Sequence, residues 1–360
     1  MTETRKPTLL VDARPLADPH AGGVRRVAEQ ILLALIKRDV ADWTFVTTGS
    51  RIPSLPAIFQ NRIEHVHIKW PNKLWTAATS FGTVSLDRAT RRITGRTYDA
   101  AILPNLGFSG YMEIPYALVL HDLSFLIEPS WFRNTSRLWH RAVNVREQTR
   151  RANRIFCVSE TTARDATRLL DIPKDKLEVF HPGIPPLPAP SPMGHAPSAP
   201  YVMTLNERDP RKNIGTAIET VHALRKEEVF RDLELVIAGC GREGTEEGIR
   251  RLGRISDAEL AELYASASAF LYPSWYEGFG LPLHEAARFG IPCLASAHGS
   301  LPETVPAGTL LLPPMKPHLW ISMLRDVLRN PSAYRTVFDE DLEETTVQGF
   351  IQWIQRVSRQ

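Results

Sequence analysis

The chain lacks the features that mark membrane-spanning, secreted and metal-binding proteins. It has only three cysteines, Cys157, Cys240 and Cys293, which lie far apart and share no metal-ligand spacing. No apolar run approaches the roughly 20 residues that span a bilayer, and the amino-terminal stretch MTETRKPTLLVDAR is too weakly apolar for a signal peptide. We therefore expect a protein of a reducing compartment, the cytoplasm.

The chain also lacks a strong excess of one charge. Its 360 residues are 43% hydrophobic and 23% charged, the balance of a soluble globular protein with room for two domains. The net charge of +3 hides an asymmetry, because residues 1–181 contain 26 Lys and Arg against 18 Asp and Glu. A basic first half suits an anionic partner such as a nucleic acid, a phospholipid surface or a phosphorylated acceptor. Solvated charge without a target fits about equally well.

One segment divides the chain. Residues 182–200 are dominated by proline, alanine and serine, so we predict a semi-rigid linker there. It separates a first domain, residues 1–181, from a second, residues 201–335. A short segment, residues 336–360, follows; whether it is a helix that packs back on the first domain is left open.

Short apolar runs alternate with segments of helical period in both halves. Strands are predicted at 8–13, 43–48, 64–70, 98–104, 116–122, 154–159, 177–183, 201–206, 233–239, 269–274, 292–296 and 308–313, and helices at 24–38, 136–152, 161–170, 213–226, 257–267, 281–290 and 317–329. This alternation predicts an α/β protein with two Rossmann-like domains built from parallel sheets. A cleft beside the carboxyl ends of their strands would then hold a ligand.

Two glycines, Gly22 and Gly23, follow the first predicted strand and precede a helix. Glycines let the backbone approach a ligand closely, and the amino-terminal end of a helix attracts anions, so a phosphate could bind there. A plain glycine turn is the alternative. The dinucleotide fingerprint G-x-G-x-x-G is absent.

His121 and Asp122 end the apolar strand YALVL, at the edge where α/β sheets display functional side chains. A buried histidine bonded to backbone is the structural alternative. Adjacent side chains on an extended chain point apart, so Asp122 need not orient the imidazole.

A basic loop follows the first strand of the second half. This loop contains Arg208, Arg211 and Lys212, and Asn213 is well suited to cap the next helix. Positive side chains beside a helix start make a pyrophosphate site plausible. An ordinary basic surface loop is the alternative.

The stretch WYEGFGLPLHE carries two glutamates, Glu277 before a predicted helix and Glu285 within its first turns. Carboxylates so placed can accept hydrogen bonds from sugar or ribose hydroxyls. Gly278 and Gly280 leave backbone amides accessible between them. Glu285 could instead only complement the helix dipole.

The motif E-G-F-G-L-P-L-H-E, together with DARPL, LHDLSFLIEPSWF, RDPRKN and GSLPETV in order, resembles the retaining glycosyltransferases of family 4, which have the two-domain GT-B fold. The resemblance covers about residues 11–328. In some members a glycine stands where Arg25 stands here. The segment after Asn330 is also short and acidic compared with that family.

The resemblance implies a set of site residues. Glu277 would hold hydroxyls of the donor sugar, and His121 would lie at the transferring sugar as a second catalytic residue, with Asp122 on the acceptor side. Donor-binding residues would be Gly22, Gly23, Arg208, Arg211, Lys212, Arg254, Ile255, Phe279, Gly280, Leu281 and Glu285. Among these, the basic side chains would neutralise the diphosphate, Arg254 and Ile255 would lie along the base, and Glu285 would bind the ribose.

The same resemblance implies an enzyme that moves a hexose, with mannose the first expectation, from a nucleotide-diphosphate sugar to a glycan or lipid-linked acceptor with retention of configuration. No metal, cofactor or nucleic acid is expected. A nucleotide-sugar epimerase of similar fold and a non-catalytic subunit are the alternatives.

The basic first half adds a prediction about membranes. Arg137 and Arg141 lie one helical turn apart, as do Arg146 and Arg150, close to Trp131 and Trp139. Arginines beside interfacial aromatic residues suit a lipid headgroup surface. We therefore expect peripheral contact with the anionic inner face of the cytoplasmic membrane, with solvated arginines as the alternative.

Overall fold

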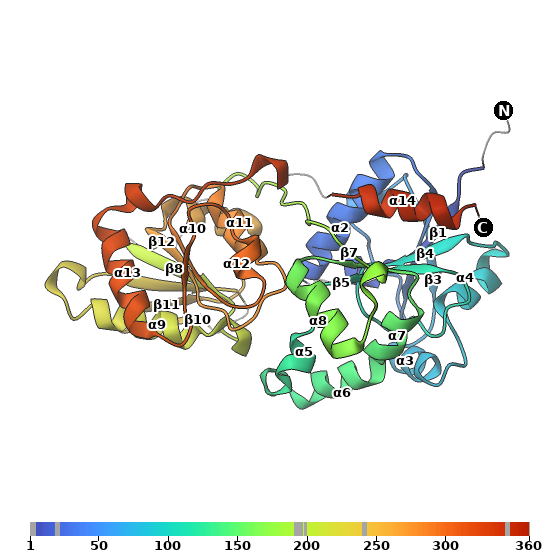
Figure 1. Ribbon diagram of the computed structural model, residues 1–360, viewed down its shortest axis with the longest axis horizontal. Helices are drawn as coiled ribbons and strands as arrows, with labels where there is room; N and C mark the ends of the chain where they lie inside the picture. Colours follow the sequence, from blue (N-terminus) through green and yellow to red (C-terminus); the bar gives the residue numbers. More distant parts are fainter. Residues whose placement is uncertain are drawn as a thin grey trace. The chain divides into compact units, whose positions relative to one another are not determined.

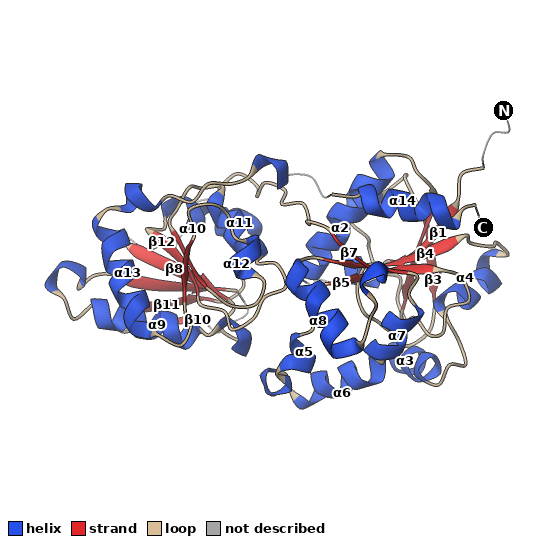
Figure 2. Ribbon diagram, viewed as in Figure 1, coloured by secondary structure: helices blue, strands red, loops and turns tan. Residues whose placement is uncertain are grey.

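The computed structural model describes residues 5–18, 22–190, 197, 200–239, 243–342 and 346–359. It contains two compact units. Unit 1 comprises Met1–Ile127, Arg133–Gly183 and Glu344–Gln360, and unit 2 comprises Glu128–Phe132 and Ile184–Glu343. Each unit is a Rossmann-like α/β domain around a seven-stranded sheet (Figures 1 and 2), which confirms the predicted fold class.

The sheet of unit 1 is parallel throughout, in the order β3-β2-β1-β4-β5-β6-β7. Its strands are β1 Thr8–Asp12, β2 Asp42–Thr48, β3 Glu64–Ile68, β4 Ala100–Leu103, β5 Tyr116–Leu120, β6 Arg154–Cys157 and β7 Leu177–Val179. The central strands are buried along their whole length, because helices cover both faces of the sheet. The central strands are therefore continuous apolar runs in the sequence, and these runs are the signal by which the strands are predicted.

The helices of unit 1 are α1 Arg14–Ala17, α2 Gly22–Lys37, α3 Asn72–Ser80, α4 Leu86–Thr94, α5 Ser124–Ile127, α6 Asn134–Val143, α7 Val145–Arg151, α8 Glu160–Leu170 and α14 Gln348–Val357. The prediction of one helix over residues 136–152 is wrong. Asn144 adopts a left-handed conformation (φ 52°, ψ 63°) that ends α6, and its side chain accepts a hydrogen bond from the Glu147 amide at the start of α7. A break of one residue does not disturb the apolar period by which the helix was predicted.

The sheet of unit 2 has the order β10-β11-β9-β8-β12-β13-β14, parallel except for the antiparallel edge strand β10. Its strands are β8 Tyr201–Leu205, β9 Glu234–Ala238, β10 Glu243–Glu246, β11 Ile249–Leu252, β12 Ala269–Tyr272, β13 Cys293–Ser296 and β14 Leu310–Leu312, and its helices are α9 Ile214–Leu224, α10 Asp257–Ser266, α11 Leu281–Ala287, α12 Leu301–Thr304 and α13 Pro317–Arg329.

Alternate residues of the strands in unit 2 enter two separate cores. Met203 and Phe270 pack with α10 and α11 on one face, whereas Val202 and Leu271 pack with α9 and α13 on the other. This arrangement follows from the two-residue period of a strand that is buried on both sides.

The chain ends in unit 1. Residues 182–190 of the predicted linker contain no helix or strand, and its residues 191–196, 198 and 199 lie outside the described residues, as does Cys240. After unit 2 the chain returns to unit 1 as α14, whose Phe350 is fully buried and stacks on Phe156 with ring centroids 3.6 Å apart.

Candidate functional site

In unit 2, the loops that follow the neighbouring strands β8 and β12 are hydrogen-bonded to each other at the carboxyl edge of the sheet. The amide of Trp275 donates to the carbonyl of Arg211 at 2.7 Å. Asn213 occupies the N-cap position of α9, as predicted, but its side chain makes no capping hydrogen bond and donates instead to the carbonyl of Pro273 at 3.0 Å. Side chains from two distant motifs therefore converge at the edge where α/β sheets bind ligands.

Lys212 and Glu277 form a buried ion pair at this edge. Their side chains are only 10% and 12% exposed, and the Lys212 Nζ lies 2.7 Å from Glu277 Oε1. The same ammonium donates to the Tyr272 hydroxyl at 2.8 Å. Burial raises the pKa of Tyr272 well above its ordinary value, and the nearby Glu277 charge raises it further, so the phenol stays neutral. The ammonium is thereby held in one place.

Arg211 makes a second ion pair next to the first. Its guanidinium bonds both carboxylate oxygens of Asp209, with Nη2 2.7 Å from Oδ2. Burial alone would raise the pKa of Asp209, but the hydrogen bonds and charge of Arg211, together with Lys212, outweigh it and lower the pKa. The side chain of Arg208 is exposed and has no partner among the described residues.

The Gly-Phe-Gly loop leads from Glu277 into α11. Gly280 has φ +94°, and a Cβ there would lie 2.7 Å from a methyl carbon of Leu301, so only glycine fits without a shift. Phe279 is buried and stacks on His284 with ring centroids 5.0 Å apart. Glu285 lies in α11 and is only 5% exposed, whereas Leu281 at the helix start is half-buried. The loop is thus closely packed at the edge of the sheet.

Arg254 and Ile255 lie at a separate pocket of the same unit. They follow β11 and line, with the β10–β11 hairpin and Glu259, a hollow of about 290 Å³. Arg254 is exposed and Ile255 half-buried. The next residue, Ser256, forms a capping box with Glu259 at the start of α10, which fixes the loop.

The site residues expected in the first half belong to unit 1. Gly22 and Gly23 are the first residues of α2, and Gly22 has φ +48°, with no atom within 4 Å of the place that a Cβ would occupy. His121 follows β5, and its Nε2 lies 2.8 Å from the carbonyl oxygen of Pro104. Because a carbonyl only accepts, Nε2 carries the hydrogen. Asp122 accepts hydrogen bonds from the amide and hydroxyl of Ser124, so its carboxylate engages the start of α5.

Burial lowers the pKa of His121, against smaller opposing effects of the Pro104 hydrogen bond and the Asp122 charge. The imidazole is therefore neutral at pH 7 and carries its hydrogen on Nε2. Nδ1 is then the acceptor nitrogen of this ring.

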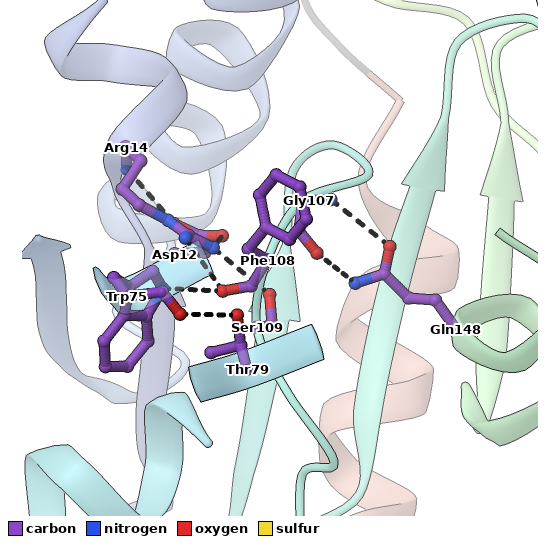
Figure 3. A network of polar contacts seen from close by, with 8 residues as sticks. All are labelled: Asp12, Arg14, Trp75, Thr79, Gly107, Phe108, Ser109 and Gln148. Carbon is purple, nitrogen blue, oxygen red and sulfur yellow. Dashed lines mark hydrogen bonds and ion pairs between the residues drawn. The ribbon is translucent and has the colours of Figure 1, made fainter. Parts of the chain in front are cut away.

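A polar network holds the loop after β4 beside the end of β1 (Figure 3). The Arg14 guanidinium bonds both carboxylate oxygens of Asp12 and donates to the carbonyl of Phe108 at 2.9 Å. The indole of Trp75 donates to the same carbonyl at 2.7 Å, and Gln148 donates to the carbonyl of Gly107 at 2.8 Å. The motif DARPL, for which the sequence suggested no role, therefore positions a loop at the carboxyl edge of unit 1.

Of the expected site residues, Lys212 and Glu277 are in direct contact through their side chains. Sequence reasoning missed Tyr272 and Asp209. Tyr272 ends β12, at the carboxyl edge where site residues are expected, and that position was its only signal. Within the described residues there is no group of three or more His, Cys, Asp or Glu that could hold a metal ion. No described helix is long and apolar enough to cross a membrane.

Two family models match the chain, one on each unit. The model described as glycosyltransferase family 4 matches residues 21–186, and the model described as glycosyl transferases group 1 matches residues 191–344. The chain belongs to the GT-B glycosyltransferases of family 4. The resemblance noted in the sequence is thereby confirmed.

Curated relatives of this GT-B chain include mannosyltransferases. It is 32% identical over 215 residues to O-antigen chain mannosyltransferase B of Escherichia coli, a match that covers 54% of this chain and 56% of that protein. It is 43% identical over 96 residues to the MMP alpha-(1->4)-mannosyltransferase of Mycolicibacterium hassiacum, covering 24% and 23%. The matches thus span about half the length of the relatives or less.

Solved structures share the GT-B fold over the whole chain. A sucrose-phosphate synthase from Thermosynechococcus elongatus has a TM-score of 0.68 at 19% identity, covering 99% of this chain and 98% of that one. Anabaena HepE, solved in complex with UDP and glucose, has a TM-score of 0.60 at 14% identity, covering 98% and 97%. At these identities the likeness shows the fold alone.

Proposed function

We propose that the protein transfers a hexose, with mannose the first choice, from a nucleotide-diphosphate sugar to a glycan or lipid-linked acceptor, with retention of anomeric configuration. The match over 215 residues to an O-antigen chain mannosyltransferase carries this proposal. The buried cationic edge of unit 2 supports it, because such an edge suits a diphosphate. The protein would act in the cytoplasm, at the membrane face.

In this proposal the carboxyl edge of unit 2 binds the donor. Lys212, with Arg211 and the exposed Arg208, neutralises the diphosphate. Glu277 gives one carboxylate oxygen to Lys212, and its remaining lone pairs accept hydrogen bonds from hydroxyls of the donor sugar. Glu285 binds the ribose. Further donor contacts are proposed for Arg254 and Ile255 along the base and for Phe279, Gly280 and Leu281 at the sugar.

Lys212 is the residue to which we assign stabilisation of the leaving diphosphate. Cleavage of the anomeric bond passes through a transition state with oxocarbenium character and places charge on the leaving diphosphate. Tyr272 and Glu277 already hold the Lys212 ammonium in place, so little reorganisation is needed as that charge develops. A preorganised contact of this kind is worth roughly 2.7–4 kcal/mol. The leaving phosphate itself assists the acceptor hydroxyl, which explains retention without an enzyme nucleophile.

Unit 1 contributes the remaining proposed contacts. Gly22 and Gly23 face the donor diphosphate. His121, neutral and hydrogen-bonded through Nε2, lies at the transferring sugar, and Asp122 lies on the acceptor side. Since the cationic side chains balance the diphosphate charge, we propose a metal-independent reaction whose rate is unchanged by chelation with EDTA.

The test begins with a thermal-shift screen against GDP-, UDP- and ADP-sugars, because a ligand that binds only the native state raises its stability. The stabilising donor is then incubated with and without glycan acceptors, and products are resolved by mass spectrometry and NMR. Lys212→Met should lower kcat about 100-fold or more. Lys226→Met, which removes an exposed lysine of the same unit, is the matched control.

Transfer of the labelled hexose to an acceptor supports the proposal. Epimerisation of the donor alone would show an epimerase instead. Failure of every sugar nucleotide to shift the melting temperature would show that the donor site is not functional.

A further inference from the structure

The loop after strand β13 of unit 2 leads into the motif GSLPETV, residues 299–305, which the proposed reaction does not use. Strands β12 and β13 are parallel neighbours in the sheet. The loops that follow them therefore meet at the carboxyl edge, where α/β sheets bind ligands. The motif thus begins beside the loop that contains Glu277.

The motif packs along the backbone of that loop. The amide of Ser300 donates to the carbonyl of Glu277 at 3.3 Å. Gly299 has φ +62°, and a Cβ there would lie 3.0 Å from the backbone nitrogen of Glu277, so the two backbones approach as closely as a glycine permits. The hydroxyl of Thr304 donates to the carbonyl of Phe279 at 2.6 Å. The motif is therefore a direct neighbour of the proposed hexose site.

His298 precedes the motif, and its side chain is exposed at the same edge. Its Nδ1 lies 2.7 Å from the carbonyl oxygen of Trp275. Because a carbonyl only accepts, Nδ1 carries the hydrogen. Nε2 has no partner among the described residues, and in the neutral ring it is a hydrogen-bond acceptor. The imidazole is thus held through one nitrogen and leaves the other available beside the Glu277 loop.

The chemistry of Nε2 indicates which ligand group it suits. An acceptor nitrogen can bond a hydroxyl, which donates, but not a deprotonated phosphate oxygen, which only accepts. The loop at His298 contacts the backbone of Glu277, the residue proposed for the hexose, whereas the ribose is assigned to Glu285. The contacts of Gly299 and Ser300 hold the two loops together independently of the imidazole.

We propose that Nε2 of His298 accepts a hydrogen bond from a hydroxyl of the transferred hexose and thereby helps to select that hexose. The contact rests on the proposed function, since it needs a sugar nucleotide bound at this edge. A site group that requires a hydroxyl in one position discriminates against a sugar that lacks it there. His298 would therefore be a specificity-determining residue of the donor site.

The test uses isothermal titration calorimetry. The wild type and variants are titrated with the sugar nucleotide selected by the thermal-shift screen and with its nucleoside diphosphate. His298→Ala should raise the Kd of the sugar nucleotide about tenfold. It should leave the Kd of the nucleoside diphosphate unchanged, because that ligand keeps the ribose and phosphates but has no hexose. His318→Ala, at an exposed histidine of the same unit, is the matched control and should change neither Kd.

Two conservative variants separate the two nitrogens of the ring. Asparagine can place an amide donor near the position of Nδ1, and glutamine can place its amide group near the position of Nε2. His298→Asn should therefore bind the sugar nucleotide as weakly as His298→Ala, whereas His298→Gln should recover a large part of the affinity. Recovery by asparagine and not by glutamine would show that His298 only holds the Trp275 loop, and would overturn the proposal.

Donor analogues that each lack one hexose hydroxyl identify the group that is bound. One analogue should bind the wild type about tenfold more weakly than the donor does and should bind His298→Ala no more weakly than the wild type. Equal affinity of the wild type and His298→Ala for the sugar nucleotide would overturn this contact and leave the proposed function standing. Failure of every sugar nucleotide to bind would overturn both.

Discussion

At the residue scale, Lys212 and Glu277 form a buried ion pair on which the proposed donor binding and the stability of unit 2 both depend. Two charges with side chains only 10% and 12% exposed are tolerated because each satisfies the other. A diphosphate that approaches Lys212 would compete with Glu277 for the ammonium. In the proposed donor site, donor affinity and protein stability would therefore be coupled at this position.

Removing one partner should cost more than removing both. Lys212→Met leaves the Glu277 carboxylate without its cation, so we expect a loss of about 3–5 kcal/mol in the free energy of unfolding. Lys212→Met combined with Glu277→Gln should recover a large part of that loss. Urea denaturation of Lys212→Met, Glu277→Gln and the double variant gives a double-mutant cycle. The cycle measures the interaction free energy of the two side chains. Additive losses would mean that the two side chains do not interact.

His121 makes stability depend on pH. Burial lowers its pKa in the folded state below the value of about 6.5 in the unfolded chain. The unfolded chain therefore binds the proton more tightly, and the stability present above pH 6.5 is lost as the pH falls through that value.

His121→Gln, which keeps a donor for the Pro104 carbonyl, should flatten the decline in unfolding free energy between about pH 6.5 and 5. The exposed His318 gives the control variant His318→Gln, which should leave the decline unchanged. Denaturant titrations at several pH values measure both. If the unfolding free energy of His121→Gln declines as steeply as that of the wild type, groups other than His121 cause the decline.

At the scale of elements, Asn144 converts one amphipathic segment into two helices. It ends α6 in a left-handed conformation and caps α7 through its side chain. Leu138 on α6 is 69% exposed, whereas Val145 on α7 is buried.

Asn144→Ala should destabilise the protein by about 1–3 kcal/mol, because alanine is strained in the left-handed backbone and cannot cap α7. Asn144→Gly removes only the cap and should cost a few tenths of a kcal/mol. Thermal unfolding of both variants distinguishes the two contributions. Equal losses would show that backbone strain has no part in the effect.

At the scale of the whole molecule, the last helix, α14, packs on unit 1. Phe350 of α14 is fully buried between Phe156, on which it stacks, and Phe180, whose centroid lies 5.4 Å away. The core on this side of unit 1 is thus completed by residues that follow unit 2 in the sequence.

Phe350→Ala should lower the stability of unit 1 by about 3–5 kcal/mol, because it leaves a cavity beside two aromatic rings. Calorimetry should show the loss as a downward shift of one transition if the units unfold separately. Val337→Ala, at a residue of unit 2 that is 61% exposed, is the control and should change little. An unshifted thermogram for Phe350→Ala would mean that α14 does not stabilise unit 1.

The sequence by itself determined the architecture. Each predicted strand is present, and α13 spans the predicted residues 317–329, because strands buried on both faces and amphipathic helices leave local periods in the chain. The family motifs likewise identified the chemistry that the comparisons support. Where the local period is absent the prediction fails: β10 reads EGTE and is exposed throughout, so neither it nor the hairpin with β11 was predicted.

Only the tertiary structure decided which side chains meet. Lys212 and Glu277 are 65 positions apart, and their contact requires β8 and β12 to be neighbours in the sheet. It also decided which basic residues pair with which acids: Arg146 and Arg150 lie 3.7 and 2.8 Å from Asp171 and Glu147, a pairing that the sequence pattern of these arginines does not reveal. Strand order and ion pairing depend on contacts between distant segments, and local periodicity contains no information about such contacts.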